Sequence, residues 1–136
     1  MSDNLKNMKD LEEAIVKYRQ VNSEKYESHI YNIFAEMYME NSWIILPCFH
    51  DRNNKPYIKL FGVPEHEEFG RFITIFTDSQ YFNKVFGTDM LYVGIKKAIE
   101  IMNSYGEKCN GLIINPATFT KELVLFKEGV NDIINL

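Results

Sequence analysis

The residues of this chain whose types could support chemistry lie in two short polar segments. Cys48, His50 and Asp51 bring a thiol, an imidazole and a carboxylate into the first of them. A thiolate enzyme needs a base within hydrogen-bonding reach and a third group that orients the base. In an extended strand, Cys48 and His50 would lie roughly 7 Å apart, which is too far for direct activation. We therefore interpret Cys48 as a buried thiol beside a loop histidine, and we expect no catalytic residues.

Histidine and acidic side chains in the same segments are possible metal ligands. His50 and Asp51 lie in the first, and the second contains the run EHEE at 65–68. Such groups can bind zinc or iron, but they do not follow HExxH or a comparable fixed spacing. Exposed loop residues are the better interpretation, so we expect neither a metal nor a cofactor.

Composition and charge narrow the function classes. The chain has 136 residues, 15 basic and 19 acidic side chains and a net charge of −4. The length fits one domain, and the acidic balance argues against nonspecific nucleic-acid binding. The N-terminus lacks a signal-peptide pattern, and no apolar run approaches the ~20 residues that span a bilayer. Cys48 and Cys109 are isolated in sequence, which indicates free thiols in a reducing compartment, so we expect a cytoplasmic protein.

Hydrophobic spacing predicts two amphipathic helices at the start of the chain. Apolar residues recur at three- and four-residue steps over about 4–20, and a wider apolar stripe follows to about Glu40. Such helices can pack on a sheet, or they can form a surface for a protein partner or a homodimer. Packing is favoured for the second helix, and both alternatives stay open for the first. We describe 1–42 as a helical extension and 43–136 as an α+β domain.

The rest of the chain predicts strands and short helices joined by polar loops. Strands are expected at 43–49, 57–61, 72–76, 90–93, 112–114 and 122–126, and helices at 78–86, 95–106 and 128–135. Short loops between the first three strands indicate an antiparallel meander, and Pro47 would confine the first strand to an edge or a bulge. Strands alternate with helices afterwards. The predicted fold is a single α+β domain whose mixed sheet has a partly parallel half and is flanked by helices.

The stretch 69–87 predicts a buried strand that runs directly into a helix. Bulky residues occupy both alternating faces of the strand: Phe72 and Phe76 on one, Ile73 and Ile75 on the other. That pattern is typical of a strand covered on both sides. The tetrapeptide TDSQ at 77–80 then predicts a capping box, with Thr77 as the cap and Asp78 in the first turn of the helix.

Two polar strand ends predict where a ligand would bind. Thr77 follows one buried strand and Asn115 follows another, and a helix of about three turns lies between them. Such a helix can return the chain to a parallel neighbour, so both strand ends would meet at one edge of the sheet. Ligands of open parallel sheets bind at that edge. The predicted ligand-binding residues are Thr77, Asp78, Asn115 and Pro116, with Arg71 at the opposite strand end.

Four short motifs, in this order, resemble the N-terminal domain of the SseB family. They are ILPCF at 45–49, IFTDS at 75–79, YFNKVF at 81–86 and GLIINP at 111–116. The resemblance covers about 43–136 and implies an α+β domain with a mixed sheet and flanking helices. Proteins of this family are bacterial, and the resemblance implies no particular active site or cofactor.

These observations favour a non-enzymatic intracellular module that binds or regulates a protein partner, without nucleic acid or membrane binding. The sequence lacks catalytic constellations, whereas an aromatic-rich domain with two additional helices offers contact surface. The alternative is a small-molecule-binding protein or an enzyme with a pocket near Thr77 and Asn115. We also predict that Cys48 and Cys109 are unpaired and dispensable for function.

Overall fold

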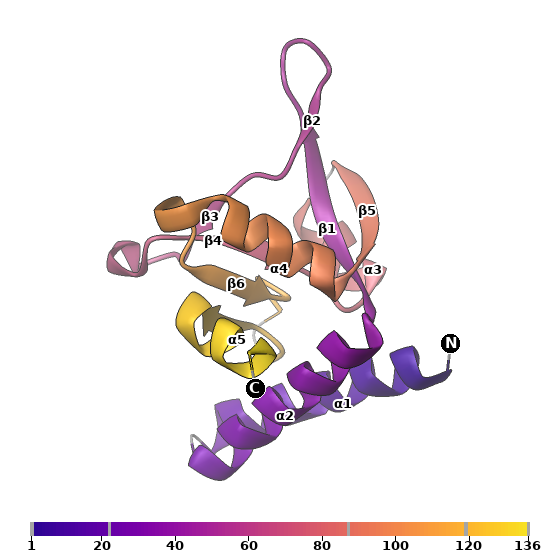
Figure 1. Cartoon of the computed structure of the whole chain (residues 1–136), viewed down its shortest axis with the longest axis vertical. Coiled ribbons are helices and arrows are strands. Elements are labelled where there is room, and N and C mark those ends of the chain that lie inside the picture. Colours follow the sequence, from indigo (N-terminus) through magenta and orange to yellow (C-terminus); the bar gives the residue numbers. More distant parts are fainter. Residues whose placement is uncertain (1, 22, 87, 119, 136) are drawn as a thin grey trace.

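A computed structural model of the chain describes residues 2–21, 23–86, 88–118 and 120–135. Two helices precede a mixture of strands and helices in an α+β fold, as the sequence predicts (Figure 1). The helices are α1 (Ser2–Gln20), α2 (Glu24–Glu40), α3 (Ser79–Val85), α4 (Ile95–Ser104) and α5 (Lys127–Ile134). The strands are β1 (Trp43–His50), β2 (Pro56–Tyr57), β3 (Phe61–Gly62), β4 (Arg71–Ile75), β5 (Asp89–Gly94), β6 (Gly111–Ile114) and β7 (Leu123–Phe126). Short 3-10 turns lie at Glu67–Phe69 and Gly106–Lys108.

The described strands form two sheets that meet at one bridge. The antiparallel sheet has the order β2-β1-β5, and the mixed sheet has the order β3-β4-β6-β7. β4 and β6 run parallel, with Ile73 opposite Leu112, which confirms the partly parallel half. Ile45 of β1 and Phe76 exchange backbone hydrogen bonds of 3.0 and 2.9 Å, and this isolated bridge joins the sheets.

The strand predicted at 57–61 is divided between the two sheets. β2 pairs antiparallel with β1 and β3 pairs antiparallel with β4, whereas residues 58–60 belong to neither strand. β2 and β3 are edge strands of different sheets, so the chain must leave one ladder before it enters the other. The two antiparallel pairs of the predicted meander are therefore present. They are formed by two separate short strands, β2 and β3, and not by one continuous strand at 57–61.

At Pro47, β1 pairs with β5 on one side and has no described strand on the other side. Ile45 directs its backbone groups toward Phe76, and Phe49 lies opposite Tyr57 on that same side. The backbone groups of every second residue in a strand point to the same side. The nitrogen of Pro47 therefore points to the same side as those of Ile45 and Phe49, away from β5, at a position between the two pairs. The missing N–H breaks no ladder bond there, which agrees with the predicted local edge.

One apolar core joins the N-terminal helices to the sheets. It contains Met8, Leu11 and Ile15 of α1, Ile30, Phe34 and Met37 of α2, Ile44 and Leu46 of β1, and Ile95, Ile99 and Met102 of α4. Figure 1 shows α1 and α2 side by side next to α5. The first helix is therefore packed, and the apolar stripes of α1 and α2 face the interior of the chain.

β4 is buried on both faces, as its pattern predicts. Residues 72–76 have exposures of 2% or less. Ile73 and Ile75 belong to the main core on the side of α4 and α5, whereas Thr74 faces the opposite side of the sheet. A hydroxyl thus lies among the aromatic and aliphatic residues that follow Arg71 in this strand.

Candidate functional site

The structure brings Thr77 and Asn115 together where β4 and β6 end. The backbone N–H of Thr77 donates to Oδ1 of Asn115 at 2.9 Å, and Nδ2 of Asn115 donates to Oγ1 of Thr77 at 3.0 Å. The N–H of Asn115 donates to the carbonyl of Ile75 at 2.8 Å. The predicted proximity of the two residues is confirmed, and Arg71 lies at the other end of β4.

These hydrogen bonds occupy the polar groups that the sequence assigns to a ligand. Asn115 is 0% exposed, and its carbonyl accepts a hydrogen bond from Oγ1 of Thr118 at 2.7 Å. Its φ of 50° is left-handed, a conformation that asparagine tolerates better than most residues. The observed contacts give the pair a structural role, because they fasten the end of β4 to the end of β6. A ligand-binding role for the pair stays a prediction.

The cap of α3 is Asp78, so the prediction of Thr77 as the cap is wrong. Oδ1 of Asp78 accepts a hydrogen bond from the N–H of Gln80 at 2.8 Å, and α3 begins at Ser79. Thr77 is instead bound to Asn115, which lies far away in sequence. The local capping pattern fails here because a long-range partner takes the hydroxyl of Thr77.

The four predicted site residues do not line a common cavity. Asp78 lines a polar pocket of about 540 Å³ that α1 closes on one side. Pro116 lines a mainly apolar cavity of about 690 Å³ on the mixed sheet. Thr77 and Asn115 line neither of these two spaces and bind one another.

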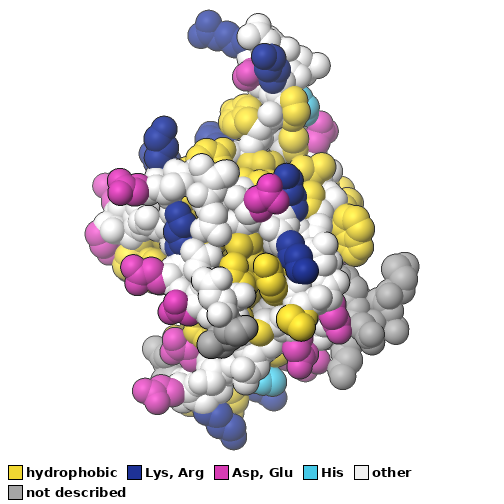
Figure 2. Space-filling view, viewed as in Figure 1, with side chains coloured by type: hydrophobic (Ala, Val, Ile, Leu, Met, Phe, Trp, Pro, Cys, Tyr) yellow, Lys and Arg dark blue, Asp and Glu magenta, His cyan; other side chains and the backbone are white. Residues whose placement is uncertain are grey.

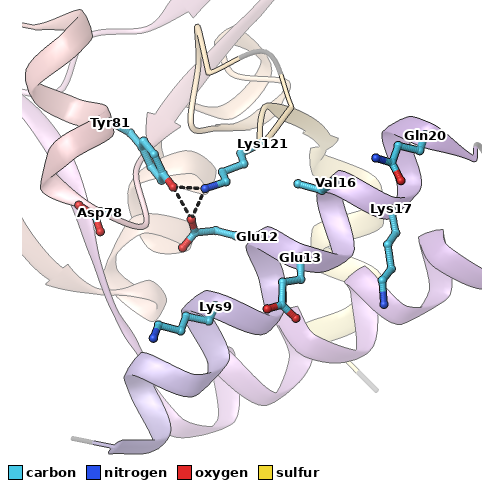
Figure 3. Close-up of a pocket in the computed structure, with 9 residues that line it drawn as sticks. All are labelled: Lys9, Glu12, Glu13, Val16, Lys17, Gln20, Asp78, Tyr81 and Lys121. Carbon is cyan, nitrogen blue, oxygen red and sulfur yellow. Dashed lines mark hydrogen bonds and ion pairs between the residues drawn. The ribbon is translucent and has the colours of Figure 1, made fainter.

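Three side chains from different elements meet in the polar pocket (Figure 3). The hydroxyl of Tyr81 on α3 donates to Oε1 of Glu12 on α1 at 2.7 Å. Nζ of Lys121, between β6 and β7, donates to the Tyr81 hydroxyl and lies 3.4 Å from Oε1 of Glu12. These contacts fasten α1 to the two segments that follow β4 and β6.

The protonation states in this cluster argue against a role as general base or amine nucleophile. Burial raises the pKa of Tyr81; the hydrogen bond from Lys121 lowers it, and Glu12 raises it further. The hydrogen bond to Tyr81 raises the pKa of Lys121. Near neutral pH, Tyr81 therefore keeps its proton and Lys121 keeps its charge. A general base or an amine nucleophile would need the opposite shifts.

The cysteines and histidines do not assemble a catalytic group in the part of the chain that the structure describes. Cys48 and Cys109 are buried and free, which confirms that they are unpaired. Each thiol lies near a neighbouring backbone carbonyl, at 3.9 and 3.4 Å respectively. His50 turns toward Asp89, with 3.8 Å between Nδ1 and Oδ2. No group of three or more His, Cys, Asp or Glu among the described residues could hold a metal ion.

The open edge of the antiparallel sheet, along β5, was not predicted from the sequence. β5 is an edge strand of that sheet, at the opposite edge from β2, and Met90, Leu91 and Tyr92 are 38, 40 and 54% exposed. Figure 2 shows apolar side chains on the surface over β5. The run MLYV predicts a strand, but nothing in it indicates that the strand lies at an edge.

Hydrogen bonding by β1 determines which backbone groups of β5 face outward. Ile45 lies opposite Tyr92, yet it directs its own N–H and C=O away from β5, toward Phe76. In an antiparallel ladder such a pair exchanges no hydrogen bonds. The N–H and C=O of Tyr92 therefore point to the open edge, as do those of Met90 two positions earlier.

The apolar cavity lies on the face of the mixed sheet that α4 and α5 do not cover. Thr74, Ile113 and Val124 stand opposite one another on β4, β6 and β7 and line its floor. Its walls come from the segment around β3 and from the end of α3. The rim includes Arg19 of α1, whose Nη1 donates to the carbonyl of Glu122 at 3.0 Å.

Two further observations bear on the function of these sites. Among the residues that the structure describes, none of the helices has the length and apolar character needed to cross a membrane. Comparisons with protein-family models, with curated proteins and with solved structures gave no match for this chain.

Proposed function

We propose that the protein is a non-enzymatic, cytoplasmic protein-binding module and that β5 is its binding strand. The observation that carries the proposal is the open edge, where Met90 and Tyr92 direct backbone groups outward beside exposed apolar side chains. An extended segment of a partner can add to such an edge. Main-chain hydrogen bonds would then supply affinity, and alternate side chains would supply specificity.

Charges near the two ends of β5 define the chemistry of the partner segment. Asp89 begins the strand with 77% of its side chain exposed, and Lys96 and Lys97 follow its end at exposed positions of α4. An antiparallel partner would therefore carry a basic residue near Asp89 and an acidic residue near Lys96. Between these ends, apolar side chains would contact Met90 and Tyr92 on one face of the strand.

Other features of the chain support this proposal over its alternatives. The N-terminal helices offer less apolar surface than their sequence suggests, because their stripes are buried in the core. The Tyr81–Lys121 cluster has protonation states unsuited to base or nucleophile chemistry. Two free, buried thiols agree with a reducing cytoplasm. Membership of the SseB family stays part of the proposal, on the motifs quoted above.

Selection of short random peptides on the purified protein tests the proposal. We expect selected sequences to alternate apolar residues between a basic end and an acidic end. Tyr92→Pro removes an outward N–H and leaves the ladder with β1 intact, so it should weaken peptide binding at least about tenfold. Met39→Lys is the matched control, since it removes an apolar side chain that is 79% exposed on α2, and it should leave binding unchanged.

A second copy of the chain is the other occupant that the edge could accept. Two antiparallel β5 strands would bring Asp89 of one copy toward the Lys96 end of the other. Sedimentation equilibrium of the full chain would then show a dimer that Tyr92→Pro dissociates, and the edge would be a self-association site. Peptides that bind wild-type and Tyr92→Pro protein equally well would contradict a role for β5.

A further inference from the structure

We propose that the apolar cavity on the mixed sheet binds a neutral, mainly apolar small molecule, and that Thr74 pairs with its one hydrogen-bonding group. The cavity measures about 690 Å³, within the range of roughly 300–1,000 Å³ that small-molecule pockets occupy. It lies on the mixed sheet, whereas the β5 edge belongs to the antiparallel sheet. The two sites can therefore be tested separately.

The side chain of Thr74 is the observation that points to a ligand. Thr74 is 2% exposed, and its Oγ1 has no hydrogen-bond partner among the residues that the structure describes. Buried hydroxyls nearly always have a partner, because burying an unpaired polar group is unfavourable. Valine would occupy the same space and favours strands. A hydroxyl at this position is accounted for by a partner that comes from outside the chain.

The position of Thr74 in the sheet places its side chain at the floor of the cavity. Thr74 lines the floor together with Ile113 and Val124, which flank it on the same face of the sheet. Both of these neighbours are aliphatic, so neither can accept or donate a hydrogen bond through its side chain. A rotation of about 120° about χ1 moves Oγ1 to another staggered position of the side chain, and it would turn Oγ1 toward a bound molecule.

The walls of the cavity favour a ligand whose apolar part is aromatic or branched aliphatic. Phe61 and Phe86 stand 5.2 Å apart between ring centroids, and His66 stacks on Phe69 at 4.7 Å. All four line the cavity. Each pair of rings is in contact, and the ring faces and edges that line the cavity favour a flat or branched apolar group packed against them.

The charges at the rim of the cavity do not favour a charged ligand over a neutral one. Arg19 and Glu122 lie on the same rim, so a cation and a carboxylate offset one another there. Nη1 of Arg19 donates to the carbonyl of Glu122 at 3.0 Å, and Oε1 of Glu122 accepts from the N–H of Ala117 at 3.1 Å. The ligand class is therefore neutral, with a hydroxyl, carbonyl, amine or amide group that can reach Thr74.

A fluorescence titration with 1-N-phenylnaphthylamine, a neutral aromatic amine, tests the site. We expect saturable binding of one probe per chain, which neutral aromatic alcohols and amides displace better than aromatic carboxylates. Thr74→Val should weaken probe binding by several-fold to about tenfold, whereas Thr74→Ser keeps the hydroxyl and should bind nearly as the wild type does. Ser42→Ala is the control, because the buried hydroxyl of Ser42 also has no partner among the described residues but does not line the cavity.

Amide chemical shifts locate the bound probe. Shifts should move at Thr74, Ile113 and Val124 on the cavity face, and move less on α1 and α2. Val124→Phe should fill the cavity and reduce binding without changing the circular dichroism spectrum. Absence of saturable binding, shifts confined to another region, or equal affinity of wild-type and Thr74→Val protein would each overturn the proposal.

Discussion

β4 and β5 are apolar strands of similar length in very different surroundings. β4 lies between β3 and β6, and residues 72–75 have exposures of 2% or less. β5 has β1 on one side, and its opposite edge leaves Met90, Leu91 and Tyr92 at 38–54% exposure. Similar side chains thus stabilise the fold in one strand and remain available at the surface in the other. Packing among the described residues does not explain the apolar surface of β5.

Truncation of matched aliphatic side chains should give the largest contrast between the two strands. Ile73→Ala in β4 would leave a cavity in the main core and should lower the free energy of unfolding by about 2–5 kcal/mol. Leu91→Ala in β5 removes a side chain that is 40% exposed, so the loss should stay below about 1 kcal/mol. Urea unfolding of both variants measures the difference. Equal losses would mean that β5 is part of the core.

The locked end of β4 provides a second contrast with the open edge. Asn115→Ala removes both hydrogen bonds to Thr77 and places alanine at a left-handed φ. We expect the free energy of unfolding to fall by about 1–3 kcal/mol. Asn53→Ala is the control, because Asn53 lies in the exposed hairpin loop. A small loss at Asn115 would show that its contacts do not hold the two strand ends.

Replacing the buried hydroxyl of Thr74 in β4 should change the free energy of unfolding in the opposite direction. Thr74→Val should raise the free energy of unfolding of the unliganded protein by about 1 kcal/mol, because it removes a buried hydroxyl that no described residue pairs with. Ser42→Ala should act in the same direction for the same reason. Thermal and urea unfolding would show both effects. A loss of stability in Thr74→Val would indicate that the hydroxyl already has a favourable contact.

The smallest expected effect is a pH dependence of the contacts that hold α1. The pKa values of Tyr81 and Lys121 are both raised in the folded chain, Tyr81 chiefly by burial and Lys121 chiefly by its hydrogen bond to Tyr81. For raised pKa values, the stabilisation is fully present below the unfolded values and is lost as pH rises through the folded values.

This pH dependence can be measured by comparing Tyr81→Phe with the wild type at about pH 8 and at about pH 11, on either side of the usual tyrosine pKa. The variant lacks the titrating hydroxyl, so its difference in urea midpoint from the wild type should narrow at the higher pH. The effect should be small, because the Lys121 side chain is 34% exposed and solvent weakens its interactions. A difference that stays constant with pH would contradict the account.

The sequence predicted β4 better than β5 for a physical reason. Alternating bulk on both faces of 72–76 is a local signal of burial, and a connecting helix favours a parallel neighbour, so the meeting of Thr77 with Asn115 could be inferred. Whether the run MLYV lies inside a sheet or at its edge depends on long-range pairing. The exposed side chains of β5 were therefore not predictable.

The same limit explains the other differences. The division of 57–61 between two sheets follows from where β1 and β4 lie in space, which the alternation of residues within the segment does not show. Asp78 replaces Thr77 as the helix cap because Asn115 binds Thr77 from a distant part of the chain. Threonine suits any strand, so the sequence does not show that the hydroxyl of Thr74 has no partner among the described residues. That depends on which residues surround it in the folded sheet.

Amide hydrogen exchange of β5, with and without a selected peptide, tests most directly whether this strand binds a partner. The N–H groups of Met90 and Tyr92 face the open edge, whereas those of Leu91 and Val93 face β1. If the peptide adds as a strand, exchange at Met90 and Tyr92 should slow markedly, and exchange at Leu91 and Val93 should change little. A bound peptide that leaves Met90 and Tyr92 unprotected, or that protects α1 and α2 instead, would contradict the proposal.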